Sequence, residues 1–157
     1  MKRLALGLIL SSGFAQSVLY ANESVSPKEI VQEYFANLQS GKFAELMALL
    51  DDNIIWHQPG NSKLSGTHVG KDAVGKLFGE FMSISGGTFK IDEVKNITVN
   101  GVLVSANLHF SAHRCQYFDF EMSMDGVDVM KVVDGKIKEV FLISGDQQLE
   151  DKFWGTL

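Results

Sequence analysis

Residues Phe118–Ile137 read FDFEMSMDGVDVMKVVDGKI, and this stretch predicts a β-hairpin. Apolar side chains recur at every second position, which is the period of a strand with one buried face. We place this strand from Tyr117 to Val133. The Asp134-Gly135 pair that follows is a typical two-residue hairpin turn, and a second strand is expected over Lys136–Ser144.

The same alternation extends toward the N-terminus. It predicts strands over Thr88–Val99 and Val102–Arg114, joined by an Asn100-Gly101 turn. A shorter apolar run, Ile54–His57, predicts one earlier strand that ends before Pro59-Gly60. The second half of the chain is therefore expected to be an antiparallel meander.

The first half of the chain carries helical periodicity instead. Ser26-Pro27-Lys28-Glu29 is a capping box with proline at the first helical position, and the helix it starts is expected to end at Gly41. Two more helices are expected over Lys42–Leu50 and Lys71–Ile84. Helices followed by a meander indicate the α+β class, with three N-terminal helices packed on one face of a bent sheet.

The first 21 residues have the three-part layout of a signal peptide. A basic start is followed by the apolar run Leu4–Leu10, and Ala21 is a plausible cleavage point. The apolar run is too short for the roughly 20 residues that a membrane-spanning helix needs. We therefore expect a signal peptide at 1–21, a single domain at 22–157, a periplasmic or secreted protein, and no stable membrane insertion after cleavage.

Charge and cysteine content narrow the class of partner. The full chain has a formal net charge of −5, and loss of Lys2 and Arg3 with the signal peptide would make the domain more acidic. An acidic domain without basic runs argues against nucleic acid as a partner. Cys115 is the sole cysteine, so no intrachain disulfide can form.

Three segments together resemble a known family. They are DNIIWHQPG at 52–60, LSGTHVGK at 64–71 and DVMKVVDGKI at 128–137. Their order and spacing resemble the SnoaL-like branch of the nuclear transport factor two superfamily, which includes ketosteroid isomerases, polyketide cyclases and limonene epoxide hydrolase. The resemblance implies a cone-shaped α+β barrel in which a strongly curved, mainly antiparallel sheet encloses an apolar pocket. It also implies a homodimer.

Asp128 is the first candidate for chemistry. On the alternating pattern it lies among Phe and Met side chains, where loss of hydration would raise the pKa of its carboxyl. Such a group can take and return a proton near neutral pH, and the resemblance implies the same role. A bulge at Gly126 would reverse the register and turn Asp128 outward, so both orientations stay open.

Two histidines are further catalytic candidates. His109 resembles a histidine of cyclase-like relatives and would orient the aspartate, although strict alternation places it on the polar face of its strand. His57 precedes a strand end and would reach the pocket mouth. Trp56 points to the opposite face from His57, and Trp56 is expected either in the core or against the ligand.

The remaining candidates would bind the ligand. Tyr34 would line the pocket from the first helix, and the apolar face of the hairpin strand would supply Phe118, Phe120, Met122, Met124 and Met130. No metal is expected, because His109 and His113 lie about 13 Å apart along a strand and cannot share one ion. No other cofactor is expected.

Two functions fit these residues, and a third is structural. The first is an exported isomerase or cyclase-type enzyme acting on a small apolar carbonyl compound, with Asp128 as general acid and base. The second is a non-catalytic periplasmic protein that binds a hydrophobic ligand. The segment Glu139–Leu142 favours this second function, because cyclase-like relatives often carry Glu-His-Trp-Asp there. The third is a dimeric interaction domain whose interface is the valine-rich face of Val102–Ala112.

Overall fold

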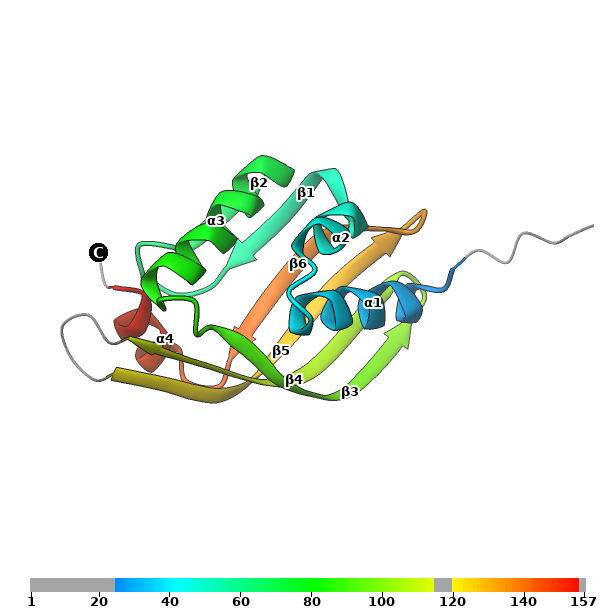
Figure 1. The fold of residues 1–157 in the computed structure, drawn as a ribbon. Helices are drawn as coiled ribbons and strands as arrows, with labels where there is room; N and C mark the ends of the chain where they lie inside the picture. Colours follow the sequence, from blue (N-terminus) through cyan, green and yellow to red (C-terminus); the bar gives the residue numbers. More distant parts are fainter. Residues whose placement is uncertain (1–24, 115–119, 156–157) are drawn as a thin grey trace, which may run out of the picture.

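The computed structural model describes residues 25–114 and 120–155. The predicted signal peptide at 1–21, Cys115 and Phe118 lie outside these ranges. Figure 1 shows the α+β fold: a strongly curved, open sheet with helices packed on one side of it. Within the described residues no helix is long and apolar enough to cross a bilayer.

The described chain contributes six strands to one sheet, in the order β2-β1-β6-β5-β4-β3. Neighbours pair antiparallel, except that β1 and β6 run parallel. The strands are β1 (Leu50–Gln58), β2 (Gly66–Val69), β3 (Lys90–Asn100), β4 (Leu103–Arg114), β5 (Phe120–Val133) and β6 (Lys136–Ser144).

Four helices complete the described part of the fold: α1 (Pro27–Gln39), α2 (Phe43–Leu49), α3 (Lys71–Ile84) and α4 (Gln147–Trp154). The predicted capping box begins α1, where the Ser26 hydroxyl accepts from the Glu29 N–H and the Glu29 carboxylate accepts from the Ser26 N–H. At the other end of the domain, the Asp146 carboxylate caps α4 by accepting from the Leu149 N–H at 3.0 Å.

The predicted elements are all present, and two short ones were missed. Strand β2 pairs with β1, with Trp56 opposite His68, and α4 follows the last strand, so the helix count rises from three to four. Phe43 of α2 and Met82 of α3 are 47% and 46% exposed, and both line a cavity.

The register around Gly126 is continuous. Strands β4 and β5 pair without interruption from Leu103 opposite Lys131 to Arg114 opposite Phe120, so no bulge reverses β5 at Gly126. The glycine serves another purpose, because an added Cβ would lie 3.0 Å from Phe110 Cε1 and 3.2 Å from the Ile143 carbonyl oxygen. It therefore lets the Phe110 ring pack close to β5.

The core lies between the helices and the concave face of the sheet. The inward residues of β4, among them Val104, Ala106 and Leu108, are buried there. The alternative in which this valine-rich face forms a dimer interface is therefore wrong, because these side chains pack beneath the helices. Any interface must use another surface.

Candidate functional site

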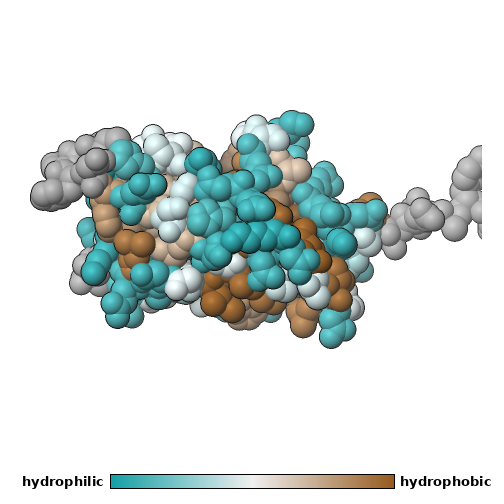
Figure 2. Space-filling model, turned by 90° about the horizontal axis from the view of Figure 1, so that it is seen from below, coloured by the Kyte–Doolittle hydropathy of each residue, from teal (hydrophilic) through white to brown (hydrophobic). Residues whose placement is uncertain are grey.

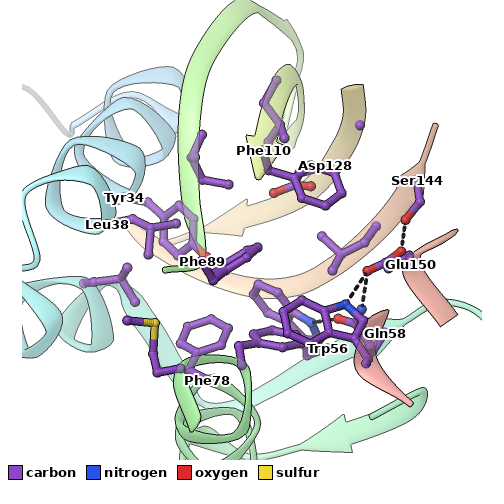
Figure 3. A pocket seen from close by; sticks show the side chains of 18 of the residues that line it. Tyr34, Leu38, Trp56, Gln58, Phe78, Phe89, Phe110, Asp128, Ser144 and Glu150 are labelled. Atoms are coloured by element: carbon purple, nitrogen blue, oxygen red, sulfur yellow. Dashed lines mark hydrogen bonds between the residues drawn. The ribbon is translucent and has the colours of Figure 1, made fainter. Parts of the chain in front are cut away.

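A cavity of about 340 Å³ lies between the sheet and the helices (Figure 3). This volume falls within the range of small-molecule sites. Its wall is mostly apolar and rich in aromatic rings, including Phe78, Phe81, Phe89 and Phe110. Such a wall favours a small apolar or aromatic ligand.

Asp128 faces this cavity from the middle of β5. It is paired across the sheet with Ala106 on one side and Leu142 on the other, and both point inward. Its side chain is half-buried: one side borders the open space of the cavity, and protein atoms surround the others. Among the described residues, none donates a hydrogen bond to its carboxyl.

The surroundings of Asp128 favour its neutral form. Burial raises the pKa of its carboxyl to about 7, and the nearby Glu150 carboxylate adds to this rise by repulsion. Asp128 can therefore hold a proton or release it close to neutral pH, which is what proton transfer to and from a substrate requires.

Tyr34 reaches the same cavity from α1. Burial raises the pKa of its hydroxyl well above the ordinary value, and the negative charge of Asp128 raises it further. The hydroxyl therefore stays protonated and can donate a hydrogen bond to a ligand oxygen. Figure 3 shows Asp128 between Tyr34, on the α1 side of the cavity, and Glu150, on the α4 side.

A second carboxyl, Glu150 of α4, also lines the cavity. Its Oε1 atom accepts from Gln58 Nε2 and from the Trp154 indole, each at 3.1 Å, and its Oε2 atom accepts from the Ser144 hydroxyl. Gln58 in turn accepts from the Trp56 indole at 3.3 Å (Figure 3). These bonds join α4 to β1 and β6, and they occupy the polar atoms of this wall.

The structure brings three sequence-predicted residues together at the cavity: Asp128, Tyr34 and Trp56. His57 lies on the outer face of the sheet instead. Its Nε2 atom lies 3.0 Å from Glu139 Oε1, and its ring stacks on Phe141 at 4.2 Å between centroids. His57 does not reach the pocket mouth, because its strand position alternates with the inward Trp56.

His109 also lies on the outer face, as the alternation in its strand indicated. Its Nδ1 atom is 2.7 Å from Asp125 Oδ1, and its Nε2 atom is 3.0 Å from Ser123 Oγ. Lys95 pairs with the same carboxylate at 2.6 Å. This polar cluster lies across the sheet from the cavity, so His109 does not orient Asp128.

The methionines and the phenylalanine of β5 that were expected to line the pocket do not lie on the cavity wall. Met122 and Met130 are fully buried in the core, and Met124 is 7% exposed, with its sulfur 3.4 Å from the Asp146 backbone nitrogen. Phe120 packs against Phe153 with 5.8 Å between ring centroids. All four point inward, but they fill the space below the helices and leave the cavity wall to other residues. Phe118 lies outside the described residues.

Sequence reasoning missed Asn37, Gln58 and Glu150, all of which line the cavity. Asn37 follows Tyr34 by three residues, so helical spacing alone could have placed the two on one face. Nothing local in the sequence marks Glu150, because its position depends on where α4 docks. In the described ranges no group of three or more His, Cys, Asp or Glu side chains is placed to hold a metal ion.

Comparison with known proteins places this chain in a family. The sequence model of the SnoaL-like domain matches residues 31–140, most of the described chain. The chain belongs to the SnoaL-like family. A protein of unknown function with a cystatin-like fold from Xanthomonas campestris is 38% identical, with 83% of this chain and 99% of that chain covered and a TM-score of 0.79. No curated protein matches this SnoaL-like chain.

Two further structures resemble this SnoaL-like protein. Bal32a, from a soil-derived mobile gene cassette, is 27% identical, with 85% and 99% of the two chains covered and a TM-score of 0.76. A candidate polyketide cyclase from Xanthomonas campestris is 18% identical, with 82% and 96% covered and a TM-score of 0.61. At 18% identity, the likeness to the candidate polyketide cyclase shows a shared fold and nothing more.

Proposed function

We propose that this SnoaL-like protein is an acid–base enzyme that moves a proton beside the carbonyl group of a small apolar compound. One observation carries the proposal: a carboxyl with a pKa of about 7 faces an aromatic-lined cavity without a protein hydrogen-bond donor. A group in this state is suited to take up a proton and return it. The fold it shares with a candidate polyketide cyclase supports the same class of reaction.

The proposed reaction uses Asp128 and Tyr34. The ionised Asp128 takes a proton from the carbon next to the carbonyl, and the electron pair moves to the carbonyl oxygen as an enolate. The Tyr34 hydroxyl donates a hydrogen bond to that oxygen. In an isomerase the proton then returns to another carbon; in a cyclase the enolate carbon bonds to a second carbonyl carbon, whose oxygen takes the proton.

Deuterium exchange into a simple ketone tests this proposal without knowledge of the substrate. We expect the protein in D₂O to exchange the protons at carbon 2 of 1-tetralone faster than buffer does, as followed by proton NMR. Asp128→Asn should lose this acceleration, and Asp125→Asn, on the outer face of the same strand, should keep it. Equal exchange by wild type and Asp128→Asn would refute the role of Asp128.

A second candidate function is non-catalytic binding of a hydrophobic ligand. The observation that favours it is Leu142, an apolar residue of the final strand, which lines the cavity where cyclase-like relatives often carry polar groups. In this case 1-tetralone would bind without exchange, and Asp128→Asn would keep its affinity. The same NMR samples, titrated for binding, distinguish the two functions.

Export is part of the proposed function. The signal-peptide pattern at 1–21 supports it, and the periplasm or the outside of the cell is then the place of action. Expression of the full chain followed by mass spectrometry of the periplasmic fraction should show a mature form that begins after Ala21. An uncleaved chain retained in the cytoplasm would contradict export.

We also propose that the protein forms a homodimer through the outer face of the sheet. Phe141 and Ile143 of β6 are 44% and 57% exposed there, opposite Val129 and Val127 of β5. Figure 2, a view from below that of Figure 1, shows hydrophobic residues gathered along the lower side of the picture among mainly hydrophilic ones. Light scattering should give twice the chain mass, and Phe141→Ser should halve it.

A further inference from the structure

Asn37 is a buried polar residue on the wall of the cavity whose amide is not fully paired. It lies on α1, one turn after Tyr34, and is only 8% exposed. Its Nδ2 atom has no hydrogen-bond partner among the described residues. Buried side-chain amides are nearly always bonded, so an unpaired one needs an explanation.

Neighbouring amides show that the fold can pair such groups. Gln39, two residues further along α1, donates from Nε2 to the Ile91 carbonyl at 3.2 Å. Gln58, on the opposite wall, uses both ends of its amide, accepting from Trp56 and donating to Glu150. Unlike these two amides, the Asn37 amide has an unpaired nitrogen, and Asn37 lies on the wall that also carries Tyr34 and Asp128.

The two walls of the cavity are therefore unlike in their free hydrogen-bonding capacity. On the α4 side the polar atoms of Gln58 and Glu150 are bonded to one another and to tryptophans. On the α1 and β5 side, Tyr34, Asn37 and Asp128 receive no such bonds from described residues. A ligand would place its oxygen atoms on the second side and its apolar body against the aromatic wall.

We infer that the Asn37 amide pairs with a second oxygen of the ligand, so that the protein selects ring ketones that carry another hydroxyl or carbonyl. This inference rests on the proposed function, which places the first carbonyl at Tyr34. Residues three apart on a helix lie on the same face, so Asn37 lies beside Tyr34 on the wall where the ligand would place its oxygens. Rotation of the amide about its last bond presents either its N–H or its oxygen, so a hydroxyl or a carbonyl is accepted.

A matched pair of probes tests the inference. The probes are 1-tetralone, with one oxygen, and 4-hydroxy-1-tetralone, with a second oxygen across the ring. Binding is followed by the fluorescence of Trp56 and Trp154, which both line the cavity. We expect wild type to bind the hydroxylated probe about three- to tenfold more tightly, the gain of one hydrogen bond. Asn37→Leu should lose this preference and keep its affinity for 1-tetralone.

Gln39→Leu is the matched control, because it removes an amide of the same helix that is already paired. It should keep the probe preference and lower the Tm. Asn37→Leu should instead raise the Tm by a few degrees, since it removes an unpaired buried amide. A lower Tm for Asn37→Leu would overturn the inference by giving Asn37 a structural partner.

The outcomes separate this inference from the proposed function. A wild type without preference, or an Asn37→Leu variant that keeps it, overturns the inference. If Asp128→Asn still abolishes deuterium exchange in that case, the proposed function stands. Loss of preference in Asn37→Leu without any exchange by wild type would support the ligand contact and refute catalysis.

Discussion

Replacing Asp128 with asparagine should change how the stability of the protein depends on pH. The pKa of Asp128 is about 7 in the folded protein, whereas an aspartate in an unfolded chain titrates near 3.9. Between these values the folded state binds more protons than the unfolded state. The contribution of Asp128 to the free energy of unfolding is therefore fully present below about pH 4 and is lost as the pH rises through 7.

The size of this effect follows from the same two pKa values. Each unit of pKa shift corresponds to about 1.4 kcal/mol, so the loss amounts to about 4 kcal/mol between pH 4 and pH 8. Asparagine cannot ionise, and the variant lacks this loss. The free energy of unfolding of Asp128→Asn, minus that of wild type, should rise by about 4 kcal/mol over the range, because groups that do not interact with Asp128 titrate alike in both proteins.

Urea unfolding followed by tryptophan fluorescence at each pH unit from 4 to 8 measures this difference. Asp125→Asn is the matched control on the same strand. Lys95 and His109 lower the pKa of the exposed Asp125 by hydrogen bonding, so its removal should cost stability at neutral pH and not at low pH. A difference between Asp128→Asn and wild type that stays constant from pH 4 to pH 8 would refute the burial argument.

Three other substitutions test separate parts of the structure. Gly126→Val should lower the free energy of unfolding by about 1–3 kcal/mol, because the new side chain would push the Phe110 ring into the cavity. It should also weaken the binding of 1-tetralone. An unchanged affinity in a fluorescence titration would contradict this. Glu150→Ala should cost about 2–4 kcal/mol in urea unfolding, because it leaves several buried donors, the Trp154 indole included, without an acceptor. Tyr34→Phe should change the free energy of unfolding by less than about 1 kcal/mol, because the hydroxyl has no partner among the described residues; a larger loss would reveal one.

The sequence predicted those elements whose signals are local. The Asp134-Gly135 turn and the capping box at Ser26 are each specified by a few adjacent residues, and the structure confirms both. Strand β2 has no such signal, because its four residues are held in place by pairing with β1. Helix α4 was missed for a related reason, since it docks through the buried Glu150.

The candidate site could be predicted in part. Alternation placed Asp128 among inward residues, and only the pairing with β4 could decide whether Gly126 changed that register. The alternation of apolar residues along β5 also predicted that Met122 and Met130 point inward, and their burial confirms this. It could not say that they lie in the core and not at the cavity, because that depends on where α1 and α3 cross the sheet.

The parallel pairing of β1 with β6 has a consequence for the order of folding. Trp56 lies opposite Val140, so contacts of the first strand join residues more than eighty positions apart in the chain. Closing such a long loop is slow compared with the formation of helices or hairpins. During synthesis, α1, α2 and α3 leave the ribosome before the strands that cover them. The N-terminal half would then expose its apolar faces until the last strand arrives, a period in which a chaperone can still bind the unfolded chain.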